Sequence, residues 1–182
     1  MNHYSGDEQF FGEAAPSVLD FWRWAFSDLT NNTIRGVLAE FLVAHAAGVL
    51  DGVRDPWATY DLTTKKGLKL EVKSSGYLQS WRDTPGRQVS FTIAKSRIFD
   101  TEAGKYVGEP KRHADSYVFA MHMERDPKRL NPLDLSAWWF WVVPTQQLDA
   151  LGDQKTMSLS RVQQLGGEGL SWVRLREVVG GM

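Results

Sequence analysis

The stretch LKLEVKSSG, residues 68–76, decides the fold that this chain is expected to adopt. Apolar residues alternate with Glu71 and Lys73 over its first part, which is typical of a half-buried strand. Residues two apart in a strand point to the same face of the sheet. The carboxylate of Glu71 and the ammonium of Lys73 are therefore expected to project together. The opposite face is expected to pack through Leu68, Leu70 and Val72.

A hairpin is expected to bring a second carboxylate onto the same face. The residues Lys65-Lys66-Gly67 favour a tight turn between strands at about 58–63 and 68–74. This register returns Asp61 to a position opposite Glu71. Two carboxylates and one ammonium are costly in a core, because buried charges need partners or a metal. Such a set of oxygen ligands suits a hard divalent cation.

A helix before the hairpin is expected to supply a third carboxylate. Asn31-Asn32-Thr33 provide capping side chains for a helix over residues 34–48, which ends at Gly48. One face of this helix is small apart from a single glutamate, Glu40, and consists of Val37, Glu40, Ala44 and Ala47. We expect the helix to approach the sheet along this face and to place Glu40 at the contact.

The remaining elements complete an α/β fold in which helices flank a central mixed sheet. Apolar alternation predicts a third strand, and two apolar runs predict strands buried on both faces. The predicted elements are a first helix (16–29), the third strand (88–94), a short helix (95–97), a loop (100–114), two strands (116–123, 138–144) and two short helices (145–151, 158–167).

The chain is expected to form a single domain, residues 1–182. A core over about residues 31–145 follows an N-terminal helical extension of about residues 1–30. A C-terminal extension with helices and a strand is expected over about residues 146–182.

The composition narrows the possible classes of protein. The chain is 42% hydrophobic and 24% charged, as in ordinary globular proteins. It contains no cysteine, which excludes disulfides and thiolate zinc sites. A net charge of −1 gives no global attraction to nucleic acid, although a local basic cleft remains compatible with it. The sequence shows neither a signal peptide nor a long apolar run, so no membrane association and a cytoplasmic location are expected.

Glu40, Asp61 and the tripeptide Glu71-Val72-Lys73 together resemble the PD-(D/E)XK nuclease superfamily, the restriction endonuclease-like proteins. The resemblance covers roughly residues 30–145, and EVKSSGYLQSW (71–81) resembles an uncharacterised bacterial group within that superfamily. It implies an α-β-β-β-α-β core with an acidic residue, a following E-x-K pair and an extra glutamate from the first helix. One position departs from the motif, since Tyr60 rather than proline precedes Asp61.

The resemblance implies a metal-dependent deoxyribonuclease, an endonuclease that hydrolyses phosphodiesters in DNA. Asp61, Glu71 and the carbonyl of Val72 are expected to hold Mg²⁺ or Mn²⁺, with Glu40 completing the shell. Lys73 is expected to orient the attacking water or to neutralise developing charge. A role in restriction or defence, and a homodimer that cuts two strands, are expected by analogy with the superfamily.

Polar and basic residues around this motif are candidates for binding nucleic acid. Side chains of this kind contact the phosphates of a strand. The principal candidates are Arg35, Ser74, Ser75, Gln79, Gln88 and Arg97, and further basic residues in the same region are Arg82, Arg87 and Lys95.

Three other interpretations stay open at this stage. In the first, Lys73 serves only in a structural salt bridge with Glu71, Asp61 or Glu40. In the second, the chain is a catalytically inactive module on the same fold that binds nucleic acid or a partner. In the third, it is a metal-dependent hydrolase of another phosphorylated substrate.

Overall fold

A four-stranded mixed sheet forms the centre of the protein. The computed structural model describes residues 3–80, 84–86 and 88–182. The strand order is β1 (Leu62–Thr63), β2 (Lys69–Gly76), β6 (Ser116–His122) and β7 (Trp138–Pro144). β2 pairs antiparallel with β1 and parallel with β6, whereas β6 and β7 are antiparallel. The predicted α/β class with a mixed central sheet is therefore confirmed.

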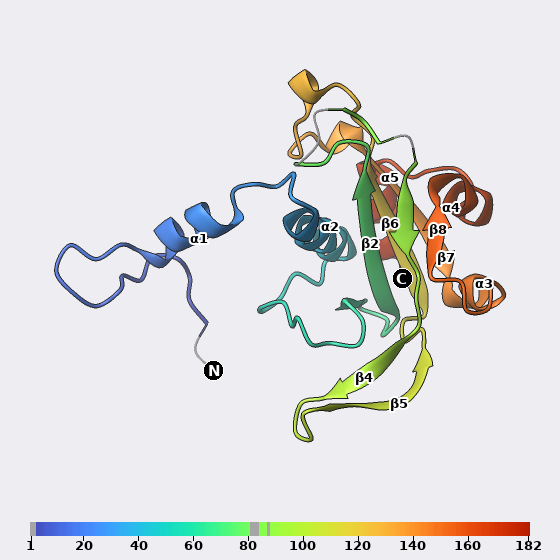
Figure 1. Cartoon of the computed structure of the whole chain (residues 1–182), viewed down its shortest axis with the longest axis horizontal. Helices are drawn as coiled ribbons and strands as arrows, with labels where there is room; N and C mark the ends of the chain where they lie inside the picture. Colours follow the sequence, from blue (N-terminus) through green and yellow to red (C-terminus); the bar gives the residue numbers. More distant parts are fainter. Residues whose placement is uncertain (1–2, 81–83, 87) are drawn as a thin grey trace.

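Helix α2 (Asn32–Ala47) covers one face of this sheet (Figure 1). The side chain of Asn31 accepts a hydrogen bond from the amide of Thr33, and the helix ends at Gly48, whose φ is +67°. Small buried residues of α2, such as Ala39 and Ala46, allow a close approach to the sheet. Helix α5 (Trp172–Gly180) joins the same core.

The other face of the sheet packs against a second core. Two short strands, β3 (Ser90–Thr92) and β8 (Thr156–Ser158), pair antiparallel there. Two helices, α3 (Thr145–Asp149) and α4 (Leu159–Gly166), lie on the same side in Figure 1 and confirm the predicted helical pieces of the tail. Their buried side chains meet Phe91, Phe119 and Met121 of the strands. The sheet therefore lies between two apolar layers.

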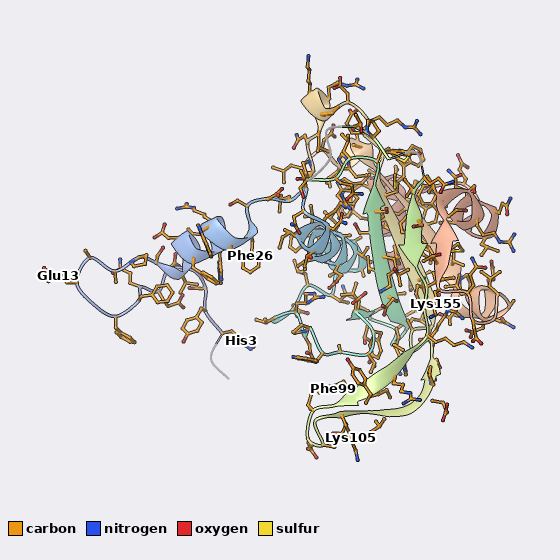
Figure 2. All side chains as sticks on the ribbon, in the orientation of Figure 1. His3, Glu13, Phe26, Phe99, Lys105 and Lys155 are labelled. Atoms are coloured by element: carbon orange, nitrogen blue, oxygen red, sulfur yellow. The ribbon has the colours of Figure 1, made fainter. Side chains whose placement is uncertain are left out.

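The segment between the third and fourth predicted strands differs from the expectation. The predicted short helix at residues 95–97 and the predicted loop at 100–114 are wrong. These residues form a hairpin of β4 (Ser96–Asp100) and β5 (Lys105–Lys111), which projects from the body (Figures 1 and 2). Most of its side chains are exposed on both faces, so no apolar alternation marks the strands.

The third strand also has a different partner from the one that an α-β-β-β-α-β core implies. Val89, Phe91 and Ile93 are buried in alternation with exposed neighbours, as predicted. Among the described residues, however, β3 hydrogen-bonds with β8 and not with the central sheet. Residues 93–115, all described, contain no helix, so a hairpin occupies the place of the expected second helix. Two 3₁₀ turns, Pro127–Arg129 and Leu135–Ala137, connect β6 to β7.

The N-terminal arm extends away from the body in Figures 1 and 2. Its helix α1 (Val18–Phe26) lies within the predicted range and starts after Ser17, which forms a capping box with Asp20. No residue of α1 is buried. No helix in the described part of the chain combines the length and the apolar character that a membrane span requires.

The turn between β1 and β2 confirms the predicted hairpin register. The amide of Gly67 donates to the carbonyl of Thr64 at 2.9 Å, and the amide of Asp61 donates to the carbonyl of Leu70 at 3.0 Å. Since Leu62 lies opposite Leu70, Asp61 lies opposite Glu71. β1 is shorter than the predicted strand. The predicted burial of Leu68 is wrong, because it follows the turn and is 40% exposed.

Two glycine substitutions test how the turn is held. Gly67 has a φ of +86°, and a Cβ there would contact nothing within 4 Å. Gly67→Ala should therefore cost about 1–2 kcal/mol of stability through backbone strain alone. Gly36, inside α2, has equal space and an ordinary φ, so Gly36→Ala should stabilise by about 0.5–1 kcal/mol. Urea unfolding measures both, and shifts of the same sign would contradict this account of the turn.

Candidate active site

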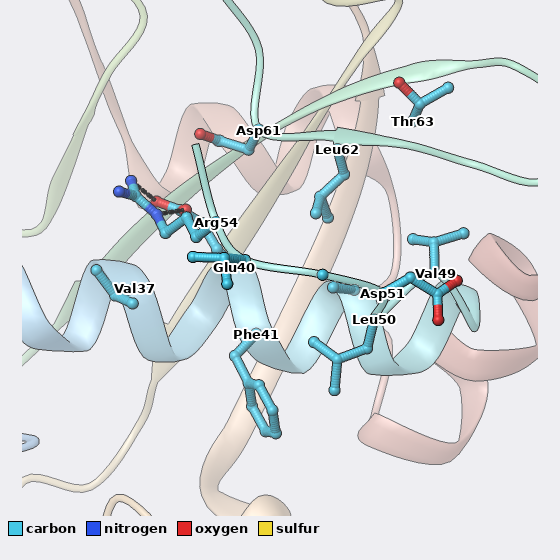
Figure 3. Close-up of a pocket in the computed structure, with 13 residues that line it drawn as sticks. Val37, Glu40, Phe41, Val49, Leu50, Asp51, Arg54, Asp61, Leu62 and Thr63 are labelled. Carbon is cyan, nitrogen blue, oxygen red and sulfur yellow. Dashed lines mark hydrogen bonds and ion pairs between the residues drawn. The ribbon is translucent and has the colours of Figure 1, made fainter. Parts of the chain in front are cut away.

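The four predicted site residues come from three elements that meet at the β1 edge of the sheet. Glu71 and Lys73 lie on β2, on the face opposite the buried residues Leu70 and Val72. Asp61 directly precedes β1, and Glu40 lies in the middle of α2. The hairpin places Asp61 beside Glu71, and the helix brings Glu40 towards Asp61 from the other side (Figure 3).

Asp61 is a half-buried carboxylate held by the backbone. Its Oδ2 accepts a hydrogen bond of 2.7 Å from the amide of Val72. In the described part of the chain, Asp61 forms no ion pair. Burial, followed by the negative charges of Glu71 and Glu40, raises the pKa of Asp61 to about 7. The Val72 amide and the Lys73 ammonium oppose this rise but do not cancel it.

Glu71 and Lys73 form an ion pair. The Lys73 Nζ lies 2.5 Å from Oε1 of Glu71, and the two side chains are 29% and 18% exposed. The salt bridge considered from the sequence is therefore present for this pair. Tyr117 lies opposite Glu71 on β6. Burial and the neighbouring Glu71 carboxylate raise the pKa of the Tyr117 hydroxyl well above its usual value, so the phenol stays protonated.

Glu40 is paired with a residue that the sequence did not suggest. The guanidinium of Arg54 contacts both carboxylate oxygens of Glu40, with Nη2 2.9 Å from Oε1 (Figure 3). Arg54 lies in the irregular segment between α2 and β1, where no periodicity indicates its direction. The interaction with Glu40, and more weakly the charge of Asp61, raises the pKa of Arg54.

The predicted sheet-facing side of α2 is partly wrong. Ala44 and Ala47 are buried, but Val37 is 37% exposed. The side chain of Glu40 is 15% exposed and lies at the margin of the contact. The helix faces the sheet through Ala39, Val43 and Ala46, which is a rotation of about one residue step from the predicted face. Glu40 therefore reaches Asp61 around the edge of the sheet.

A cavity of about 500 Å³ opens beside Glu40, Arg54 and Asp61. Its other walls are mainly apolar and include Val37, Phe41, Leu50, Val53 and Leu62 (Figure 3). Glu40, Arg54 and Asp61 lie together at one end of this cavity, and Asp51 lies apart from them (Figure 3). Three carboxylates against two cations leave one negative charge, which falls on Asp61 because Glu40 and Glu71 have their own partners.

The donor atoms suit Mg²⁺ or Mn²⁺ in kind, since carboxylate and carbonyl oxygens are the ligands that hard cations prefer. Within the described ranges, no three acidic or histidine side chains already converge as a metal cluster. Asp61 is available without breaking an ion pair. Glu40 and Glu71 would first have to exchange Arg54 and Lys73 for the metal.

The predicted nucleic-acid-binding residues divide into two groups. Ser74, Ser75, Gln79 and Gln88 line one polar pocket at the end of β2, together with Arg35. Arg35 is buried and so does not form the exposed rim that the sequence suggested.

Four of the predicted basic residues lie away from this pocket or outside the described residues. Arg97 is exposed on β4, in the projecting hairpin. Arg82 and Arg87 lie outside the described residues. Lys95 pairs with Asp153 at 2.8 Å.

Comparison with known proteins adds no relative. No family model matches the chain, and a search of curated proteins finds no significant match. The residues of the site are therefore the basis for assigning a function to this protein.

The raised pKa of Asp61 predicts a pH-dependent stability. Between about pH 4 and pH 7 the folded protein keeps a proton on Asp61 that the unfolded chain has lost. The metal-free protein should therefore lose stability as pH rises through this window. Asp61→Asn removes this titration and still accepts the Val72 hydrogen bond. The variant should be more stable than the parent at pH 8 and nearly equal to it at about pH 4.

Thermal unfolding of both proteins in EDTA measures this difference. Groups far from Asp61 titrate equally in the two proteins, so the difference between their curves isolates Asp61 together with the groups coupled to it. Parallel curves over the whole pH range would show that Asp61 has an ordinary pKa.

Proposed function

We propose that this protein is a metal-dependent phosphodiester hydrolase, a deoxyribonuclease of the PD-(D/E)XK type. The observation that carries the proposal is Asp61, a half-buried carboxylate with two further carboxylates nearby and no ion pair among the described residues. Its charge raises the energy of the metal-free protein, and a bound cation offsets that energy. The likeness of the four residues to the E-x-K motif supports the same class.

Asp61 and Glu71, with the carbonyl of Val72, would hold Mg²⁺ or Mn²⁺, and Glu40 would complete the set. The bound ion would supply positive charge to a phosphate oxygen and acidify a water molecule. To hold the ion, Glu71 and Glu40 would have to leave Lys73 and Arg54, their present partners. The two ion pairs therefore describe a resting arrangement of the site.

Release of Lys73 is the catalytic consequence of that exchange. In the resting arrangement, Glu71 holds the ammonium. Once Glu71 turns away, Lys73 can donate a hydrogen bond to the attacking water or to a phosphate oxygen, at the same edge of the sheet. Its flexible stem allows this movement, and a positive charge placed there stabilises the charge that develops in the transition state. Arg54, released from Glu40, is a second cation beside the cavity.

DNA is the proposed substrate. Polar residues line the pocket at the end of β2, directly beyond Lys73 along the strand. A polynucleotide that places one phosphate at Lys73 can therefore extend towards this pocket. The proposed fold class is restriction endonuclease-like, with the β4–β5 hairpin in the place of one helix.

A catalytically inactive module is the second candidate. The Arg54–Glu40 and Lys73–Glu71 pairs favour it, because they occupy two of the three carboxylates. Such a module would bind nucleic acid without a metal. The two candidates differ in whether Mg²⁺ or Mn²⁺ supports cleavage.

Asp61→Asn and Lys73→Ala test the proposed reaction. Each variant should lower Mg²⁺-dependent cleavage of DNA about a hundredfold or more. Asp61→Asn removes the negative charge that would hold the cation, and Lys73→Ala removes a positive charge at the reacting phosphate. Unfolding cannot explain the loss in Asp61→Asn, which is expected to be at least as stable as the parent. Lys105→Ala, at the exposed tip of the β4–β5 hairpin (Figure 2), is the matched lysine control and should cut normally.

Cleavage of labelled duplex and single-stranded DNA with Mg²⁺ or Mn²⁺ gives the readout. Equal cutting by the parent and both site variants would overturn the proposed site. Binding of DNA by the parent without any cleavage would favour the inactive module.

A further inference from the structure

The polar pocket that Arg35 lines lies at the end of β2, near the start of α2. It has a volume of about 380 Å³ and is built mostly from polar side chains. Its lining includes Asn32, Arg35, Ser74, Ser75, Gln79 and Gln88. None of the described residues that line it is acidic. The pocket therefore carries a positive charge, which comes from Arg35.

Arg35 is a buried cation without an anionic partner in the described part of the chain. Only 6% of this residue is exposed. Its Nη1 donates to the carbonyl of Leu78 at 3.1 Å, and its Nη2 donates to Oε1 of Gln79 at 3.0 Å and to the side chain of Asn32. All these acceptors are neutral. Buried charges are normally paired with an opposite charge. Among the described residues Arg35 lacks such a partner, and a bound anion would supply it.

Two buried polar atoms of the residues that line this pocket have no hydrogen-bond partner within the described part of the chain. They are Nε of Arg35 and Oγ of Ser74, which come from different elements. A buried donor without a partner destabilises the folded protein. The Ser74 hydroxyl can change its direction by rotation about χ1. The hydroxyl can therefore turn towards a ligand oxygen in the pocket, whereas the buried Arg35 acts on a ligand mainly through its positive charge.

The helix start adds to the same positive potential. α2 is 16 residues long and has no acidic residue in its first turn, so no side chain there offsets the positive end of its dipole. Asn32, its first residue, lines the pocket. Guanidinium, hydroxyl and amide donors around one volume suit an anion with several acceptor oxygens, and phosphate has this chemistry.

We propose that this pocket binds a phosphate group, held by Arg35, Ser74 and the surrounding neutral donors. This assignment rests on the proposed function. The phosphate belongs to the DNA strand and lies beyond the phosphate at which cleavage occurs. Ser75 lies two residues beyond Lys73 on β2 and shares its face, whereas Ser74 points towards α2 as Val72 does, so the pocket lies just past Lys73 along the strand. The pocket then sets the register of the substrate relative to Asp61 and Lys73.

A negative charge introduced at the rim tests the pocket without disturbing the buried Arg35. Gln88 is exposed and lines the pocket, so Gln88→Glu places a negative charge against the ligand. Gln147→Glu makes the same change on the exposed surface of α3, outside the pocket. Calorimetry in EDTA measures binding of inorganic phosphate and, separately, of a short single-stranded DNA. Cleavage plays no part in either measurement.

The parent should bind phosphate saturably, and Gln88→Glu should weaken this binding about tenfold or more. Gln147→Glu should leave it unchanged, and Ser74→Ala should weaken it by a smaller factor. Absence of phosphate binding, or equal binding by the two glutamate variants, would overturn the pocket.

DNA binding tests the further step. Loss of phosphate binding in Gln88→Glu with unchanged binding of DNA would overturn the assignment to the substrate strand. Phosphate binding with no cleavage under any metal would leave the pocket supported while the proposed function fails.

Discussion

The hydrogen bond from the Val72 amide to the Asp61 carboxylate is the interaction on which the candidate site depends. It holds a carboxylate against a strand that already presents Glu71 and Lys73. The backbone amide favours the charged form of Asp61, but burial and two neighbouring carboxylates favour the neutral form more strongly. The result is a carboxylate that is fixed in position and yet poorly stabilised as an anion. Binding of a cation would stabilise the anionic form of such a carboxylate.

The fold maintains this arrangement through two apolar layers. One layer holds α2 against the sheet and so limits how far Glu40 can move from Asp61. The other layer supports β2 and β6 from the opposite side. Because both layers are closely packed, the polar residues of the candidate site and of the pocket lie at the sheet edge and at the end of β2. The apolar cavity and the polar pocket described above lie at these two places.

Much of the site was accessible from sequence because its determinants are local. Period-two alternation located β2, and a turn with a glycine fixed the register that places Asp61 opposite Glu71. Capping residues located α2 within two residues. Arg54 was missed because it belongs to an irregular segment whose direction depends on the finished fold. The β3–β8 pairing was missed because it joins segments more than sixty residues apart. The β4–β5 hairpin was missed because both of its faces are largely exposed, so burial imposes no pattern on it.

The charge state of Asp61 tests the central claim most directly. A ¹³C NMR titration of its carboxyl carbon, assigned by comparison with Asp61→Asn, measures the pKa in the folded protein. Without divalent ions the pKa should be about 7, and saturating Mg²⁺ should lower it well below that value, because the cation favours the ionised form. A pKa near the ordinary value of 3.8, unchanged by Mg²⁺, would contradict both the strained carboxylate and the proposed metal site.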